Sequence, residues 1–307
     1  MSVPLPRLSV VICTHNPRAD FLSRTLASLR VQTLPFTEWE LIVVDNASRE
    51  ALSLEAVRAG HPAARVVPEP EVGLTAARLR GIAEARADLL VFVDDDNILE
   101  PDYLACATGL STTRPMLGVW GCGSYTPEWE VVPPPGFTEY LRYLAVHRAP
   151  RDHWSDRPFD YEAMPAGAGL CVRAAVARRY ADNVRNDPRR KLLGRTGGNL
   201  AGCEDFDLAL TATDLGLGTG VFTALAMTHL MPRGRVEENY LLRLIEGHAC
   251  STVLLMALRN PGFKPPRGGL LARIREFRLR RSLEPVPLKI HDARRRGERR
   301  AWKQIAS

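Results

Sequence analysis

The chain has 307 residues, of which 45% are hydrophobic and 25% are charged, which is the balance of a globular protein that needs no disulfide framework. The net charge of +6 is unevenly distributed. Residues 261–307 hold 14 Lys and Arg against 4 Asp and Glu, whereas the preceding 260 residues hold 27 against 31. A partner attracted by positive charge is therefore expected only at residues 261–307. The six cysteines lack C-x-x-C spacing and are expected to be buried free thiols.

Apolar strands alternate with helices in the first hundred residues. We predict strands at residues 8–13, 41–45, 65–67 and 89–93, and helices at 21–29, 51–59 and 74–85. Fully apolar strands in such an alternation are typical of a parallel sheet that helices cover on both faces. Sheets of this kind bind ligands at the carboxyl ends of their strands.

The second half of the chain has a less regular pattern. We predict strands at 116–124 and 166–172, a proline-rich loop at 127–135, a Gly-rich loop at 195–202, and helices at 137–146, 204–214 and 236–258. Prolines and glycines between 261 and 269 then mark a break, which a basic amphipathic helix at 270–281 and a basic tail follow. The predicted organisation is a domain at 1–260, with a nucleotide-binding half (1–112), an acceptor half (113–235) and a long helix (236–260), and an extension at 261–307.

Polar side chains follow three of the predicted strands. Asp94, Asp95 and Asp96 come directly after residues 89–93. Adjacent carboxylates repel one another and lose hydration when buried, so they either hold a cation such as Mg²⁺ or Mn²⁺ or form a solvated acidic turn. Thr14 follows the first strand and Asp45 the second, where they can bind a ligand or only cap helices and turns.

Four segments, in this order, resemble the signatures of family-2 glycosyltransferases with the GT-A fold. They are residues 10–16 (VVICTHN), 40–46 (ELIVVDN), 77–82 (ARLRGI) and 92–96 (FVDDD). The resemblance covers roughly residues 8–230 and is strongest up to residue 105. It implies a GT-A fold of the α/β class, with a mixed sheet flanked by helices. Because a Gln-x-x-Arg-Trp element and membrane helices are not found, it implies a non-processive, bacterial-type member.

The resemblance assigns residues to the donor nucleotide and to the metal. The residues implied for the nucleotide sugar are Thr14, His15, Asn16, Asp45, Arg78, Asp94 and Asp95. The D-x-D element has two possible registers, and Asp96 is the metal ligand in both. His229 is either a further ligand of Mn²⁺ or Mg²⁺ or a histidine of the core. Arg233 and Arg235 can neutralise a leaving diphosphate or can be solvated.

The resemblance also implies the catalytic base and the acceptor side. Asp205, with Glu204 as the second choice, matches the family's base, although acids at a helix start are also favoured by the helix dipole. Gly167 and Gly169 match a small-residue segment that lines the acceptor side, or form a tight turn. Trp154 is a candidate for stacking on a sugar or for packing under a loop.

The sequence thus predicts metal-dependent, inverting transfer of a sugar from a nucleotide-diphosphate donor, with UDP favoured by analogy, to the hydroxyl of a glycan, lipid-linked or small-molecule acceptor. The alternatives are a nucleotidyltransferase of similar fold and a non-catalytic protein that binds nucleotide sugars or tethers to membranes. The helix at 270–281 can lie on an anionic membrane or dock on the domain, and nucleic acid is not an expected partner. The expected location is cytoplasmic, with peripheral membrane attachment possible in principle.

Overall fold

The computed structural model describes residues 5–265 and 269–306, so residues 1–4, 266–268 and 307 of the predicted domain and extension lie outside the described residues. Within the described ranges, one nine-stranded sheet has the order β3-β2-β1-β4-β8-β6-β9-β5, and β7 pairs with β9. The strands are β1 (Leu8–Thr14), β2 (Trp39–Asp45), β3 (Arg65–Pro68), β4 (Leu89–Val93), β5 (Asn97–Leu99), β6 (Leu117–Trp129), β7 (His153–Ser155), β8 (Leu170–Arg173) and β9 (Gly218–Met231).

Helices connect these strands and continue beyond the last of them. The α-helices are α1 (Ala19–Arg30), α2 (Leu54–Arg58), α3 (Leu74–Glu84), α4 (Tyr103–Thr113), α5 (Ala174–Asn186), α6 (Glu204–Asp214), α7 (Glu238–Arg259), α8 (Leu270–Ser282) and α9 (Pro285–Ala306). Short 3-10 helices are η1 (Phe36–Glu38), η2 (Thr138–Leu144), η3 (Pro188–Leu193) and η4 (Arg233–Arg235).

The first four strands are parallel, as the sequence predicts, and β1, β2 and β4 are almost entirely buried, whereas β3 at the edge is only partly buried. β1 pairs in parallel with β2 and β4, and β2 pairs in parallel with β3. All side chains of β2 and β4 are buried, because helices cover both faces of the sheet. The antiparallel strands β8, β5 and β7 make the sheet mixed. This architecture confirms the predicted fold class.

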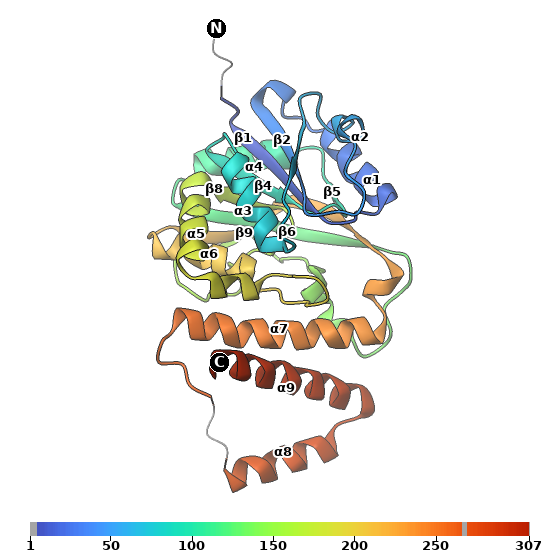
Figure 1. Ribbon diagram of the computed structural model, residues 1–307, viewed down its shortest axis with the longest axis vertical. Helices are drawn as coiled ribbons and strands as arrows, with labels where there is room; N and C mark the ends of the chain where they lie inside the picture. The colour runs from blue at the N-terminus through green and yellow to red at the C-terminus, as the bar shows by residue number, and fades with distance from the viewer. Residues whose placement is uncertain (1–4, 266–268, 307) are drawn as a thin grey trace.

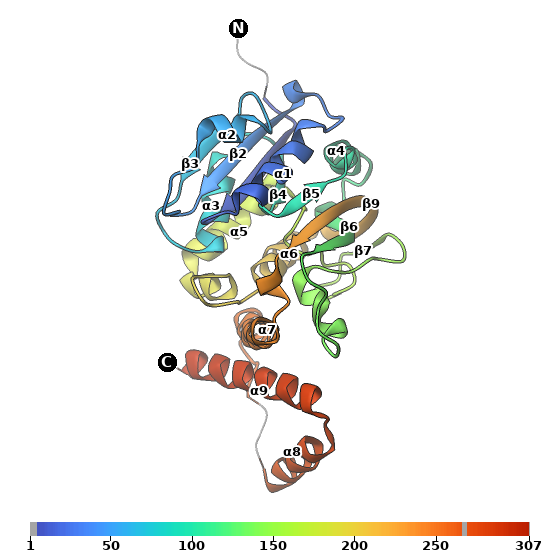
Figure 2. The same ribbon diagram turned by 90° about the vertical axis from the view of Figure 1, so that its right-hand side faces the viewer.

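Two hydrophobic layers flank the sheet. On one face, Leu22, Leu26 and Leu29 of α1 and Leu104 of α4 pack against alternate residues of β1, β2 and β4. On the other face, the intervening strand residues pack against α3, α5 and α6 (Figure 2). The period of two in a strand divides the side chains between the two layers. All six cysteines are free thiols; four are buried and two are partly buried.

Several predicted elements in the second half have different bounds. β6 continues to Trp129, so its end overlaps the predicted proline-rich loop. Pro127 fits in the strand because β8 pairs with β6 only at Val119 and Trp120, which leaves this stretch of β6 without a neighbour on that side. β8 begins at Leu170, four residues after the predicted start. The sequence pattern does not predict β5, α4, β7, α5 or α9, nor β9 as a strand of this length, and the predicted helix at 137–146 is the 3-10 helix η2.

The last three helices stack below the domain. Figures 1 and 2 both show α7 next to the domain, α9 beyond it, and α8 farthest from the sheet. α7 has the length and hydropathy of a helix that could cross a membrane, but Leu241, Leu244 and Leu255 are buried in the protein. α9 packs on α7 through small and apolar residues, Ile290, Ala293, Gly297 and Ala301.

Candidate active site

The ends of β1, β2 and β4 gather polar residues at one edge of the sheet. Thr14 and Asp45 lie opposite each other at the ends of β1 and β2. The Thr14 hydroxyl donates a hydrogen bond to Asp95, which follows β4. The Asp45 carboxylate accepts the backbone N–H groups of Ser48 at 3.2 Å and Leu52 at 3.1 Å. Asp45 therefore shapes the loop after β2 as well as presenting a carboxylate at the edge.

The loops at this edge are joined by side-chain hydrogen bonds. His15 Nδ1 lies 2.6 Å from the backbone oxygen of Asn46, and Asn16, whose φ is +51°, accepts the N–H of Arg49 at 2.8 Å. Asn46 is buried, and its amide oxygen accepts the N–H of Gly73 at 2.8 Å, just before α3. Sequence reasoning gave Asn46 no role, although an Asx residue after a strand is a turn signal. His15 and Asn16 are exposed and open to a ligand.

Asp96 is buried in a cationic environment. Arg235 Nη1 lies 2.8 Å from Asp96 Oδ2, and His229 Nε2 lies 3.4 Å from Asp96 Oδ1. Burial alone would raise the pKa of Asp96, but Arg235 and then His229 outweigh it and hold the pKa below its ordinary value. His229 reaches this place because it lies opposite Asn97 in the antiparallel β5–β9 pair. The structure thus brings two residues together that are far apart in the sequence.

Asp95 is the residue of the acidic turn whose pKa is raised. Burial, followed by the negative charge of Asp96, raises its pKa to about 7. A bound cation would relieve this repulsion. Within the described ranges, no three His, Cys, Asp or Glu side chains converge closely enough to hold a metal ion alone. Asp96 and His229, whose Nε2 faces Asp96 Oδ1 at 3.4 Å, nevertheless supply oxygen and nitrogen atoms of the kind that fit an Mg²⁺ or Mn²⁺ site completed by substrate phosphates.

The predicted base lies at the start of α6, beside a buried ion pair. Arg78 is 2% exposed, and its Nη1 lies 2.9 Å from Glu204 Oε1. Its Nη2 also donates to the backbone oxygen of Gly167 at 3.3 Å. Arg78 and Glu204 therefore bind each other in this structure, instead of facing a ligand. Burial would lower the pKa of Arg78, but the charges of Glu204, Asp94 and Asp205 outweigh it and raise the pKa, so one residue of the acidic turn and two at the start of α6 act on the same buried cation.

Asp205 is partly exposed and differs from Glu204 in its partners. Asp205 Oδ2 accepts the N–H of Gly167 at 2.9 Å, and Oδ1 accepts the N–H of Phe206 at 2.8 Å. Burial and then the adjacent Glu204 raise its pKa to about 7, against the opposing effect of Arg78. A carboxylate with this pKa can both accept a proton near neutral pH and be ionised beforehand, which suits a general base.

The three residues predicted for the acceptor side have separate positions. Gly167 contacts both Arg78 and Asp205, and a Cβ atom there would lie 2.4 Å from Arg78 Nη2. Gly169 has a φ of +70°, and its carbonyl accepts the Tyr103 hydroxyl at 2.6 Å, so it is a turn glycine in the core. Trp154 is 43% exposed on β7, where its partner in the β7–β9 pair is Gly220.

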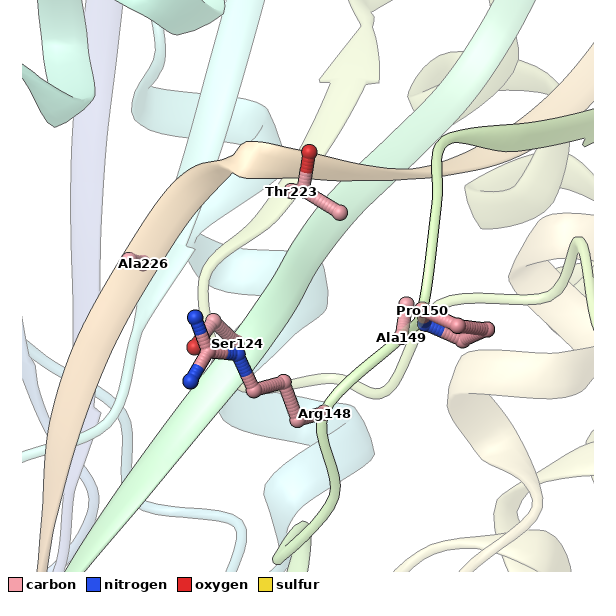
Figure 3. Close-up of a pocket in the computed structure, with 6 residues that line it drawn as sticks. All are labelled: Ser124, Arg148, Ala149, Pro150, Thr223 and Ala226. Carbon is pink, nitrogen blue, oxygen red and sulfur yellow. The ribbon is translucent and has the colours of Figure 1, made fainter.

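A cavity of about 480 Å³ opens where the β6–β9 pairing shifts register between Cys122–Phe222 and Ser124–Ala226 (Figure 3). It is lined by Ser124 of β6, by Thr223 and Ala226 of β9, and by the segment Arg148, Ala149 and Pro150. The next residue of β6, Tyr125, donates its hydroxyl to the carbonyl of Ala168 at 2.9 Å. Tyr125 does not line the cavity, and its hydroxyl holds the segment next to Gly167, which in turn bonds Asp205.

Comparison with known proteins finds similarity over the first part of the chain. Residues 9–107 match the family described as glycosyl transferase family 2. An uncharacterized glycosyltransferase, YwdF, of Bacillus subtilis is 33% identical over 32% of this chain and 35% of its own length. Validoxylamine A glucosyltransferase of Streptomyces hygroscopicus subsp. jinggangensis is 34% identical over 40% of this chain and 30% of its length. The chain thus spans about a third of the length of these relatives.

The fold also has a similar solved structure. The mannosyltransferase PcManGT from Pyrobaculum calidifontis, in complex with GDP-Man and Mn²⁺, aligns with a TM-score of 0.56 and 20% identity. The alignment covers 94% of this chain and 74% of that one. At this identity the likeness concerns the fold, which is the GT-A fold that the sequence motifs predict.

Proposed function

We propose that the chain, whose residues 9–107 match the family described as glycosyl transferase family 2, transfers a sugar from a nucleotide-diphosphate donor to an acceptor hydroxyl, with inversion of the anomeric centre. One observation carries the proposal furthest. Asp205, a carboxyl group with a pKa of about 7, is hydrogen-bonded to Gly167 beside the buried Arg78, on which the charge of Asp94 in the acidic turn also acts. The site therefore combines a proton acceptor with a place for a charged leaving group.

In the proposed reaction, the ionised Asp205 takes the proton of the acceptor hydroxyl while the hydroxyl oxygen attacks the anomeric carbon. The bond from that carbon to the donor diphosphate breaks, and the nucleoside diphosphate leaves with the bonding electrons. A bound Mn²⁺ or Mg²⁺, held by Asp96 and His229, would stabilise the charge on the diphosphate. Arg235, which neutralises Asp96 in this structure, supplies a guanidinium that can bind phosphate oxygens.

We propose further that the acceptor approaches past the cavity at β6. Its volume of about 480 Å³ is in the range of small-molecule sites. Ser124, which lines it, precedes Tyr125 in β6, and the Tyr125 hydroxyl bonds Ala168, the neighbour of Gly167, whose N–H holds Asp205. For the donor, the sequence prediction favours uridine, whereas the similar solved structure holds a guanosine donor. The nucleotide base of the donor is therefore the first variable to test.

The test measures the melting temperature with UDP, GDP, CDP, ADP or dTDP, each with and without Mn²⁺. A ligand at about 100 times its dissociation constant adds about 2.7 kcal/mol to the stability of the folded state. We expect one nucleotide to give an Mn²⁺-dependent shift that Asp96→Asn abolishes. Asp182→Asn, at an exposed pair with Arg185 on α5, is the matched control and should keep the shift. No shift with any nucleotide would refute the donor site.

Transfer is then measured with the sugar donors of the selected nucleotide. We expect Asp205→Asn to bind the nucleotide normally and to slow transfer by about 10²–10⁴-fold, since the base is lost. Formation of a nucleotide sugar and pyrophosphate from a nucleoside triphosphate would instead identify a nucleotidyltransferase. Nucleotide binding without turnover of any donor, in the presence of varied acceptors, would favour the binding-protein alternative.

A further inference from the structure

Helix α8 turns its apolar side chains away from the protein. Leu270, Ile274 and Phe277 recur at the i, i+4, i+7 spacing of one helical face, and Leu271 lies beside them. Their exposed fractions are 73%, 40%, 59% and 73%, in the order Leu270, Ile274, Phe277 and Leu271. A helix that packs on a domain normally buries such a face. The apolar face of α8, defined by these four residues, is instead free.

The contacts of α8 with α9 come from its polar side. Glu276 Oε1 lies 2.7 Å from His291 Nε2, and Arg280 forms an ion pair with Asp292. Residues two positions apart on an α-helix point about 200° apart around its axis. Ile274 and Glu276 therefore face nearly opposite directions. α8 is attached to α9 by charged groups, and its apolar face is exposed. The helix lies at the end of the molecule farthest from the sheet (Figure 1).

The charge around the apolar face restricts the kind of partner. α8 contains five arginines and one glutamate, and α9 contains seven Lys and Arg against two Asp and Glu. The Arg281 guanidinium lies over the Phe277 ring, 5.6 Å from its centroid, within the apolar face itself. A second copy of the chain that docked through the same face would bring arginines against arginines. A surface that is anionic outside and apolar beneath matches both features.

We propose that α8 lies in the interface of an anionic lipid bilayer. The four apolar side chains insert below the headgroups, and the arginines, whose long side chains can extend along the apolar face, reach the lipid phosphates. α9 is packed on α7, so α8 is held in a defined place relative to the domain. The inference does not depend on the proposed transfer reaction, because it uses only residues 270–306.

The test is flotation of the full-length chain with lipid vesicles. The probes are vesicles of phosphatidylcholine and of an equal mixture of phosphatidylcholine and phosphatidylglycerol. We expect binding to the anionic vesicles that weakens with salt. The double variant Ile274→Ser/Phe277→Ser should lower the partition coefficient by about tenfold or more, since it removes two inserted side chains. The control Leu279→Ser removes an equally apolar side chain, 44% exposed, from the opposite side of α8 and should bind within about twofold of wild type.

Each other outcome would overturn the proposal. Equal binding by the double variant, or an equal loss in the Leu279 control, would show that the apolar face does not insert. Retention on an RNA or DNA oligomer but not on vesicles would assign the charge to nucleic acid. Self-association that the double variant abolishes, without vesicle binding, would assign the face to a second copy. Melting temperatures should match among all variants because the substituted side chains are exposed.

Discussion

Replacing Glu204 by Gln tests the arrangement around Arg78 most directly. Arg78 is 2% exposed, and Glu204 is its nearest counter-charge, at 2.9 Å. Loss of one partner of a buried ion pair costs about 3–5 kcal/mol, and we expect about 3 kcal/mol here because the amide oxygen still accepts a hydrogen bond. This corresponds to a fall in melting temperature on the order of 10 °C. Glu298→Gln, at the exposed pair with Arg295, should cost about 0–1 kcal/mol.

The same substitution should move the pH dependence of transfer. After burial, the charge of Glu204 is the largest cause of the raised pKa of Asp205, and Arg78 opposes it. Without Glu204, Arg78 acts on Asp205 alone, so the pKa of Asp205 falls below its wild-type value of about 7. We expect the acid limb of kcat/KM, followed as release of nucleoside diphosphate, to shift to lower pH. An unshifted limb in folded Glu204→Gln protein would refute Asp205 as the group that titrates.

The raised pKa of Asp205 also predicts how the free energy of unfolding changes with pH. The folded protein holds a proton on Asp205 between about pH 4 and pH 7, where the unfolded chain has released it. The contribution of Asp205 to the free energy of unfolding is therefore present at low pH and lost as pH rises through about 7. Denaturation of wild type and Asp205→Asn at several pH values measures it. The wild type should lose stability relative to the variant across this range, and parallel curves would contradict the assignment.

Two further substitutions test the scaffold. Asp207 is fully buried between Arg190 and Arg259, so Asp207→Asn should lower the free energy of unfolding by about 3–5 kcal/mol in chemical denaturation, and a loss below about 1 kcal/mol would contradict the buried pair. A Cβ at Gly297 would lie 2.2 Å from the backbone oxygen of Glu246, so Gly297→Ala should lift α9 from α7 and speed its proteolysis. An unchanged cleavage rate would show that α9 is held elsewhere.

The sequence predicts the parallel half of the fold well because its strands are apolar on both faces. β4 matches its predicted bounds at both ends, and β1 differs by one residue. α9 escaped prediction because its buried stripe includes Ala293, Gly297 and Ala301, whose small side chains give little hydrophobic signal among many charges. β9 carries threonines and glycines, and only its pairing with β6 shows that it is one long strand.

The candidate site was predictable where it depends on neighbouring residues and not where it depends on distant ones. The acidic turn after β4 follows from adjacency in the sequence. The environment of Asp96 does not follow from adjacency, because His229 lies on β9 and Arg235 on η4, both more than 130 positions later in the chain. Likewise, no local pattern shows that Arg78 is buried, since its partner Glu204 is 126 positions away. Such pairings arise from the topology that brings these elements together.

The contacts of Arg259 join the end of α7 to α6. Arg259 is the last residue of α7, and its guanidinium reaches Asp207 in the first turn of α6 and Asp214 at the last position of that helix. A single side chain thus spans the helix that carries Asp205. A truncated protein that ends after Arg259 keeps the ion pairs with Asp207 and Asp214, and one that ends a residue earlier loses them. A truncation series around residue 259 would test the predicted domain limit at 260, with the added effect of losing α9, which packs on α7.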